Sequence, residues 1–278
     1  MKNWNALIVF ILFTLMYAVD SLAERSVQTI ETRPGVTLSY LLHTPDVHAK
    51  GVLILFGGGT GEGHFAGSGT DVSLSDNFLA RTSPDFVQRG FAIALVGVPS
   101  DHPSGMLDSF RTSPDHTADI HRLVQVLIKK NLAPIYLVGT SRGTLSAAYL
   151  ATSINDERVK GLILTSSLSA IGSLPLNTVT MPVLIIHHGH DDCRSTPYGA
   201  AYSLKHSFGK SPKIDFVMVN GGSAGIGYYE GRGKKRGGGG ADPCKALSHH
   251  GFLGVEEHVV DLITDWLEGK PIPEVVGD

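Results

Sequence analysis

The chain has 278 residues, of which 42% are hydrophobic, and its formal net charge at pH 7 is −3. This length and apolar content suit one large globular domain with a substantial core, and the sequence contains no internal repeat. The small negative charge gives no indication of a nucleic-acid partner.

The first 23 residues are predicted to be an export signal. Lys2 supplies a positive charge, residues 6–19 form an apolar run, and Ser21-Leu22-Ala23 offers small residues at the two positions that a signal peptidase reads. The run is shorter than the ~20 residues that span a membrane, which makes a retained anchor the less favoured alternative. We expect a single secreted or periplasmic domain over residues 24–278, without stable membrane insertion.

The mature region opens with a predicted antiparallel hairpin. Its strands cover residues 26–33 and 36–43, and apolar side chains alternate along the second strand. A strand over residues 51–56 is apolar throughout, as is typical of a strand buried on both faces. It runs into the glycine loop 57–61, where backbone amides can approach a ligand closely.

Helices and strands alternate along the rest of the chain. We expect helices over residues 77–88, 115–130, 197–206 and 254–267, and strands over residues 91–98, 159–165, 183–188 and 214–219. This alternation predicts an α/β fold with a mainly parallel sheet, helices on both faces and the first hairpin at one edge. The glycine- and lysine-rich run over residues 221–241 is expected to be a loop.

The segment 135–148 carries the strongest chemical motif. An apolar strand is followed by Gly139-Thr140-Ser141-Arg142-Gly143 and then by a helix of small residues. This G-x-S-x-G pattern between a strand and a helix is typical of a nucleophile elbow, which holds a serine on a sharp turn. Its glycines leave room where side chains would collide, and the helix N-terminus favours negative charge. Ser141 is therefore the predicted nucleophile.

A serine nucleophile needs a histidine base that is oriented by a carboxylate. The strand over residues 183–188 is followed by Asp191 and Asp192, and we select Asp192 because it lies three residues after Gly189. Before the last helix comes His249-His250-Gly251, where His250 is selected as the base because Gly251 permits a tight turn. Asp191 and His249 remain the alternatives. Neighbouring histidines show no zinc-site spacing, so no metal is predicted.

Two further features complete the predicted site. The backbone N–H groups of Arg142 and Gly58 are expected to form an oxyanion hole, with Gly59 as the alternative to Gly58. The glycine loop lacks the G-K-[ST] ending of a phosphate-binding loop. Export permits a disulfide between Cys193 and Cys244, which would tie the loop of the acid to the loop of the base.

Over residues 28–267 the chain resembles an α/β-hydrolase. Ser141, Asp192 and His250 follow the superfamily order Ser…Asp…His, and the stretches His188-Gly189-His190-Asp191-Asp192 and His250-Gly251-Phe252 are similar to the dienelactone hydrolase-like and peptidase-like branches. The resemblance implies an eight-stranded core and acyl transfer. Few residues separate the strands ending at 165 and starting at 183, so no large lid domain is expected. The loops 61–75, 100–113 and 221–248 should surround the site.

These observations favour an exported serine hydrolase that cleaves a small-molecule ester through an acyl-enzyme intermediate and needs no cofactor. A peptidase or amidase with the same triad is one alternative, although no segment is committed to binding a peptide. A non-catalytic binding protein on the same scaffold is the other, but all three triad residue types are present. The sequence does not indicate an oligomeric state.

Overall fold

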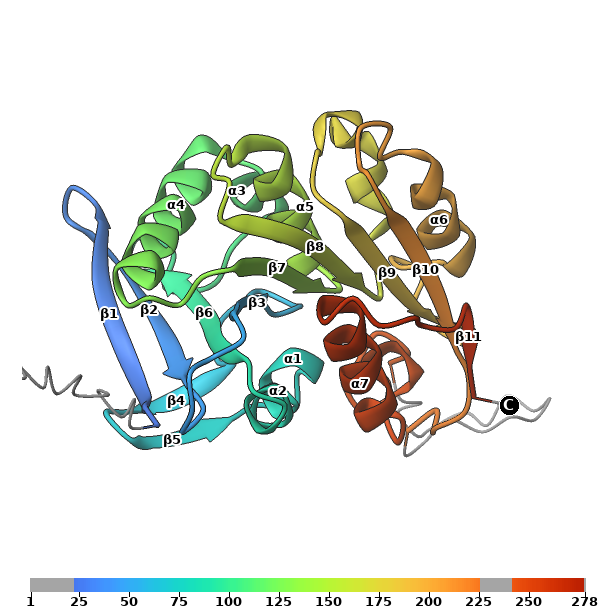
Figure 1. Ribbon diagram of the computed structural model, residues 1–278, viewed down its shortest axis with the longest axis horizontal. Helices are drawn as coiled ribbons and strands as arrows, with labels where there is room; N and C mark the ends of the chain where they lie inside the picture. Colours follow the sequence, from blue (N-terminus) through green and yellow to red (C-terminus); the bar gives the residue numbers. More distant parts are fainter. Residues whose placement is uncertain (1–22, 226–241, 278) are drawn as a thin grey trace, which may run out of the picture.

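A mainly parallel nine-stranded sheet forms the centre of the computed structural model, which describes residues 23–225 and 242–277 (Figure 1). The strand order is β1-β2-β6-β3-β7-β8-β9-β10-β11. The strands are β1 (Arg25–Arg33), β2 (Val36–His43), β3 (Val52–Phe56), β6 (Ala92–Pro99), β7 (Ile135–Thr140), β8 (Val159–Thr165), β9 (Val183–His188), β10 (Ile214–Val219) and β11 (Val275–Val276). The predicted export signal lies outside the described residues except for Ala23.

The predicted hairpin is confirmed, because β1 pairs antiparallel with β2, and β2 pairs antiparallel with β6. The other neighbours in the sheet are parallel. The expected number of eight strands is wrong for the described chain. The ninth strand is β11, which pairs with Met218 and Val219 of β10 after the last helix. Two residues are too short to show a strand pattern in the sequence.

Helices cover both faces of the sheet, as predicted. They are α1 (Phe78–Arg81), α2 (Ser83–Gln88), α3 (Asp108–Arg111), α4 (Pro114–Lys129), α5 (Gly143–Ser153), α6 (Tyr198–Ser203) and α7 (Glu256–Leu267). In Figure 1, α3, α4, α5 and α6 lie above the sheet, and α1, α2 and α7 lie below it. None of the helices in the described ranges combines the length and apolar character needed to cross a membrane.

Strand β3 shows how the sheet joins two cores. Ile54 and Leu55 are both fully buried, but consecutive side chains of a strand point to opposite faces. Ile54 therefore packs in the cluster that contains Leu123 of α4, whereas Leu55 packs in the cluster that contains Trp266 of α7. Burying a side chain of this size stabilises the fold by roughly 1.5–3 kcal/mol, so the central strands are fixed from both sides.

Two predicted helices differ in their details. The segment 77–88 forms two short helices, since Pro84 lies in the first turn of α2, a position that proline tolerates well. The next helix, α4, begins at Pro114 and is capped by Ser113, whose Oγ accepts a hydrogen bond from His116 N, rather than by Asp115 or Thr117. The first difference divides one predicted helix into two, and the second changes only the start of a helix.

The loops around the site are compact. Residues 61–75 contain a second hairpin, β4 (Phe65–Ser68) and β5 (Asp71–Leu74), which is joined to β1 where Val27 N donates to Gly69 O at 3.0 Å. Between β8 and β9, a segment described in full, there are two short 3₁₀ helices, Ser169–Ser173 and Leu176–Thr178. That segment therefore holds no lid domain.

Candidate active site

Ser141 lies on the turn between β7 and α5. Its φ is 52°, in the left-handed region that residues with a side chain seldom adopt. The flanking glycines make this turn possible: a Cβ on Gly139 would lie 2.6 Å from Gly143 O, and a Cβ on Gly143 would lie 2.0 Å from Phe56 O. The segment therefore has the strained geometry expected of a nucleophile elbow.

Backbone hydrogen bonds hold this turn in place. Ser141 N donates to Thr165 O of β8 at 3.1 Å, and Ser141 O accepts from Thr144 N at 2.9 Å. The hydroxyl of Thr144 accepts in turn from Leu168 N at 3.1 Å. The position of Ser141 is thus set by neighbouring strands and by the first turn of α5.

A cavity of about 360 Å³ opens above this turn. Its wall includes both Ser141 and His250, together with residues of the glycine loop, of the turn before α1 and of the segment before His250. The lining residues are Gly58, Gly59, Glu62, Gly63, His64, Ser75, Asp76, Asn77, Phe78, Thr140, Ser141, Cys244, Lys245, Ala246, His250 and Gly251. Two of the three expected loops contribute to this wall, and the loop 100–113 does not.

The carboxylate beside His250 belongs to Asp191. His250 Nδ1 lies 2.9 Å from Asp191 Oδ2, and both residues are buried, with 4% and 8% of their surfaces exposed. Asp192 is exposed. The selection of Asp192 is therefore wrong, and the alternative Asp191 occupies the position expected of the orienting acid.

The local backbone explains why Asp191 is the residue that faces inward. Cys193 N donates to Asp191 Oδ1 at 3.0 Å, and the hydroxyl of Thr196 donates to Oδ2 at 2.9 Å. The same hydroxyl lies 3.2 Å from His250 Nδ1. Adjacent side chains point in different directions, so a count of residues from Gly189 could not distinguish the two aspartates.

The pKa of Asp191 is lowered despite its burial. Burial alone would raise it, but the hydrogen bond with His250, the charge of that imidazole and the Cys193 amide favour the carboxylate. On its other side, His187 Nε2 lies 3.5 Å from Asp191 Oδ2. Burial lowers the pKa of His187 to about 4, so this imidazole is neutral at pH 7. Asp191 is thus an ionised acceptor for His250.

Several groups fix the backbone around His250. The hydroxyl of Ser166 donates to His250 O at 2.7 Å, and His250 N donates to the hydroxyl of Ser248 at 3.2 Å. His249 faces elsewhere, because its Nδ1 lies 3.2 Å from His190 O and its ring stacks on His188 with 4.4 Å between centroids. The structure therefore brings His250, and not His249, to the acid.

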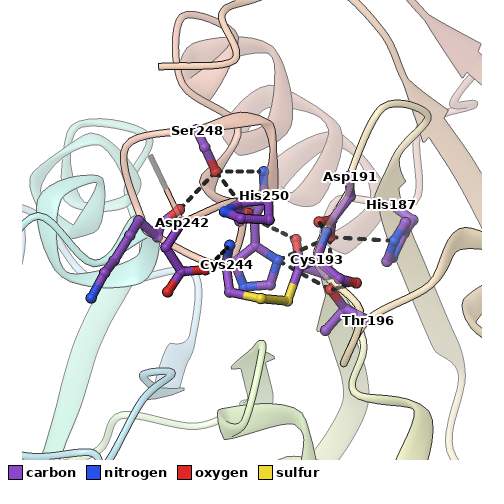
Figure 2. Close-up of a disulfide and its surroundings, with 11 residues drawn as sticks. His187, Asp191, Cys193, Thr196, Asp242, Cys244, Ser248 and His250 are labelled. Carbon is purple, nitrogen blue, oxygen red and sulfur yellow. Dashed lines mark hydrogen bonds and ion pairs between the residues drawn. A yellow bond between two sulfur atoms is a disulfide. The ribbon is translucent and has the colours of Figure 1, made fainter. Parts of the chain in front are cut away.

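The predicted disulfide between Cys193 and Cys244 is present, with 4.7 Å between the two Cα atoms. Figure 2 shows that it joins the loop of Asp191 and Thr196 to the loop of Ser248 and His250. Cys244 also lines the cavity. The bond therefore connects the two loops directly beside the pair that they form.

The glycine loop approaches Ser141 closely. A Cβ on Gly58 would lie 3.0 Å from Ser141 Cβ, so only glycine fits there without displacement. His64 Nε2 lies 3.1 Å from Gly58 O, and Arg111 Nη2 donates to Gly59 O at 3.1 Å. These two buried side chains fix the backbone of the loop. The oxyanion donors, Arg142 with Gly58 or Gly59, stay a prediction.

Sequence reasoning missed these supporting residues. His64 follows the glycine loop by three positions, which is the one signal that could have identified it. Arg111 is fully buried, and burial lowers its pKa to about 10. Nothing in its local sequence separates it from a surface arginine. Thr196 likewise belongs to no motif.

The donor atoms of Asp191, Cys193 and His250 lie within 4.8 Å of one another, close enough to hold a metal ion in principle. Their chemistry does not fit a metal. Cys193 is bonded to Cys244 and offers no thiolate, and His250 Nδ1 is hydrogen bonded to Asp191. This group is better described as an acid–base pair beside a disulfide.

No protein-family model and no curated protein matches the sequence. Solved structures do. Est1E from Butyrivibrio proteoclasticus matches with a TM-score of 0.59 and 15% identity over 88% of this chain and 98% of its own. Dienelactone hydrolase from Anabaena variabilis matches with a TM-score of 0.59 and 13% identity over 90% and 100%.

A third structure, the acylaminoacyl peptidase of Pyrococcus horikoshii, has a TM-score of 0.58 and 13% identity over 90% of this chain and 42% of its own. Identities this low establish the fold alone. The strand order, the antiparallel first hairpin and these likenesses agree with the resemblance drawn from the motifs. The chain has the α/β-hydrolase fold.

Proposed function

We propose that this chain is an exported serine hydrolase that cleaves a small-molecule ester through an acyl-enzyme intermediate. The observation that carries the proposal is one cavity whose wall holds Ser141 on a strained turn and a buried His250 paired with Asp191. Ser141 would be the nucleophile, His250 the base that activates its hydroxyl and Asp191 the acid that orients the base, in the chain order of this fold.

In the proposed reaction, Ser141 Oγ attacks the ester carbonyl carbon while His250 Nε2 accepts the hydroxyl proton. His250 Nδ1 keeps its proton in the hydrogen bond with Asp191, which holds the ring and stabilises the imidazolium. The carbonyl oxygen becomes an oxyanion that accepts hydrogen bonds from Arg142 N and from Gly58 N.

The tetrahedral intermediate then collapses. His250 returns the proton to the leaving alcohol, and Ser141 retains the acyl group. Water, deprotonated by the same imidazole, repeats the sequence and releases the acid. No cofactor takes part in these steps.

The choice of an ester draws on one of the similar structures. It is a dienelactone hydrolase, and a lactone is a cyclic ester. Another is an acylaminoacyl peptidase, and amide cleavage by the same residues is the competing reaction. The disulfide and the signal-like residues 1–23 favour an oxidising compartment outside the cytoplasm.

A panel of chromogenic short-chain esters beside peptide anilides tests this function. Wild-type protein should hydrolyse at least one ester much faster than any anilide. Ser141→Ala should lower ester turnover by several orders of magnitude while leaving the fold intact. A wild-type protein that cleaves anilides and no ester would identify an amidase. Equal turnover by the wild type and Ser141→Ala would show that Ser141 is not the nucleophile.

A further inference from the structure

Asn77 lies in the cavity wall, immediately before α1. Its Oδ1 accepts a hydrogen bond from Leu79 N at 3.2 Å and so caps the helix, while its own N donates to the hydroxyl of Ser75 at 3.3 Å. A side-chain oxygen that accepts from a backbone N–H leaves no doubt about which end of the amide is Nδ2. The cap therefore fixes the direction of the Asn77 NH₂ group.

This NH₂ group lies beside the nucleophile and the glycine loop. A Cβ built on Gly58 would be 3.5 Å from Asn77 Nδ2 and 3.0 Å from Ser141 Cβ. The Asn77 amide and the Ser141 side chain therefore lie on either side of the space next to the Gly58 Cα. All three residues line the cavity. In the part of the chain that the structure describes, no acceptor is hydrogen bonded to Nδ2, so its two protons are available to a ligand in the cavity.

We propose that Asn77 Nδ2 donates a hydrogen bond to the carbonyl oxygen of the substrate as that oxygen becomes an oxyanion. Asn77 would then be a catalytic residue, adding a side-chain donor to the backbone donors of Arg142 and Gly58. The inference rests on the proposed function. Ser141 Oγ forms the bond to the carbonyl carbon, the carbonyl π electrons move to oxygen, and the proton goes to His250. The Asn77 protons are shared with the oxyanion and are not transferred.

A donor that is already held in position stabilises the transition state without reorganisation. The helix cap provides that fixed position, because moving Nδ2 would break the bond from Leu79 N. The competing explanation is that Asn77 only caps α1. The two roles use different ends of one amide, so they can be separated by substitution.

Asn77→Ser and Asn77→Asp both keep an oxygen that can cap the helix, and both remove the NH₂ donor. Asn77→Ala removes the cap and the donor together. We expect kcat for the best ester to fall by about tenfold or more in Asn77→Ser, at nearly unchanged KM, since single oxyanion donors contribute about 10²–10³ in kcat elsewhere. Asn77→Asp should be slower still, because a carboxylate beside the oxyanion repels it.

A transition-state analogue gives a second readout that a cap alone would not affect. The affinity of Asn77→Ser for a trifluoromethyl ketone should fall by the same factor as its kcat/KM. Its melting temperature should equal that of the wild type, whereas that of Asn77→Ala should be lower. Ser113→Ala, which removes the cap of α4 away from the cavity wall, is the matched control and should lower the melting temperature without lowering kcat.

The inference is overturned if Asn77→Ser keeps kcat and analogue affinity within about twofold of the wild type, or if only KM rises. It is also overturned if Asn77→Ala alone loses turnover, in step with its stability. Failure of the proposed function has a different signature, namely ester turnover that persists in Ser141→Ala. A dead Ser141→Ala variant beside a fully active Asn77→Ser variant would remove only the role of Asn77.

Discussion

The two sides of the cavity are built in different ways. Ser141 comes from one continuous strand, turn and helix, and its position is fixed by close contacts between backbone segments, such as that of Gly143 with Phe56. Asp191 and His250 are 59 positions apart in the chain, and side-chain groups hold their two loops together. The motif that carries the nucleophile thus lies in one continuous segment, although tertiary contacts fix its position, whereas the acid–base pair comes from two separate segments.

This difference predicts that the two sides of the cavity respond differently to substitutions. The acid–base side should lose activity when a side-chain contact next to the pair is removed, because such contacts orient Asp191 and His250. They include those of Thr196 with Asp191 and His250, that of Ser166 with His250 and the disulfide. The turn that carries Ser141 should instead be destabilised when a methyl group enters its close backbone contacts.

The largest effect is expected where the acid is removed. Asp191→Asn should lower kcat by about 10⁴-fold, since an amide cannot hold the base in the required tautomer. Asp192→Asn is the matched control, and its kcat should change far less, because the exposed Asp192 is not the carboxylate bonded to His250. Steady-state kinetics of both variants on one ester decide the assignment. The opposite ranking would return the acid to Asp192.

The next effect concerns the tie between the two loops. Replacing both Cys193 and Cys244 with serine should lower the free energy of unfolding by about 4 kcal/mol, the chain-entropy value for a loop of this length. The bridge spans 51 positions. Urea unfolding measures the change, and kcat should fall as well because His250 loses its restraint. An unchanged unfolding midpoint with full activity would show that the loops hold without the bond.

A substitution at the elbow tests the other side. Gly143→Ala should destabilise the fold by about 3 kcal/mol, because its Cβ would lie 2.0 Å from Phe56 O and the backbone must move. Gly172→Ala is the control, since a Cβ there has no neighbour within 4 Å. Thermal unfolding of the two variants gives the comparison. Equal melting temperatures would mean that the elbow is not held by this contact.

The last effect is a dependence of stability on pH, which comes from two buried neutral histidines. Burial lowers the pKa of His187, beside Asp191, to about 4, and burial together with the charge of Arg111 lowers that of His116 to about 3. Both values lie below the 6.5 of an unfolded histidine, so the unfolded chain binds more protons in this range. Stability should therefore fall as the pH drops from 6.5 toward 4.

His116→Phe isolates one of these contributions. His116 packs edge-on against Phe56, and its Nε2 has no partner within the described residues, so a phenyl ring can replace it. The variant should lose about 3 kcal/mol less than the wild type between pH 6.5 and pH 4. Urea unfolding at both pH values measures the difference. Identical pH dependence in the two proteins would exclude His116 as a contributor.

The same contrast explains how much could be predicted from sequence. The bounds of β8, β9 and β10 agree with the predicted strands, because each is a short, mainly apolar run with clear ends. The elbow is recognisable because its close backbone contacts require glycine at two nearby positions, Gly139 and Gly143. The choice between Asp191 and Asp192 depended on which of two adjacent side chains faces His250, and spacing carries no such information.

Other features were out of reach for related reasons. Strand β11 is two residues long, and its pairing depends on the path that the chain takes after α7. Arg111 is buried because two distant carbonyl and hydroxyl oxygens, of Gly59 and Ser146, accept its hydrogen bonds. Such contacts join elements that are far apart along the chain, so composition and periodicity do not reveal them.

The central claim is that Ser141 is a nucleophile activated by His250. Reaction with a fluorophosphonate, followed by peptide mass spectrometry, tests it most directly. We expect one adduct, on the peptide that contains Ser141, with no adduct in Ser141→Ala and much slower labelling in His250→Ala. An adduct on a different serine, or labelling of Ser141→Ala at the wild-type rate, would contradict the account.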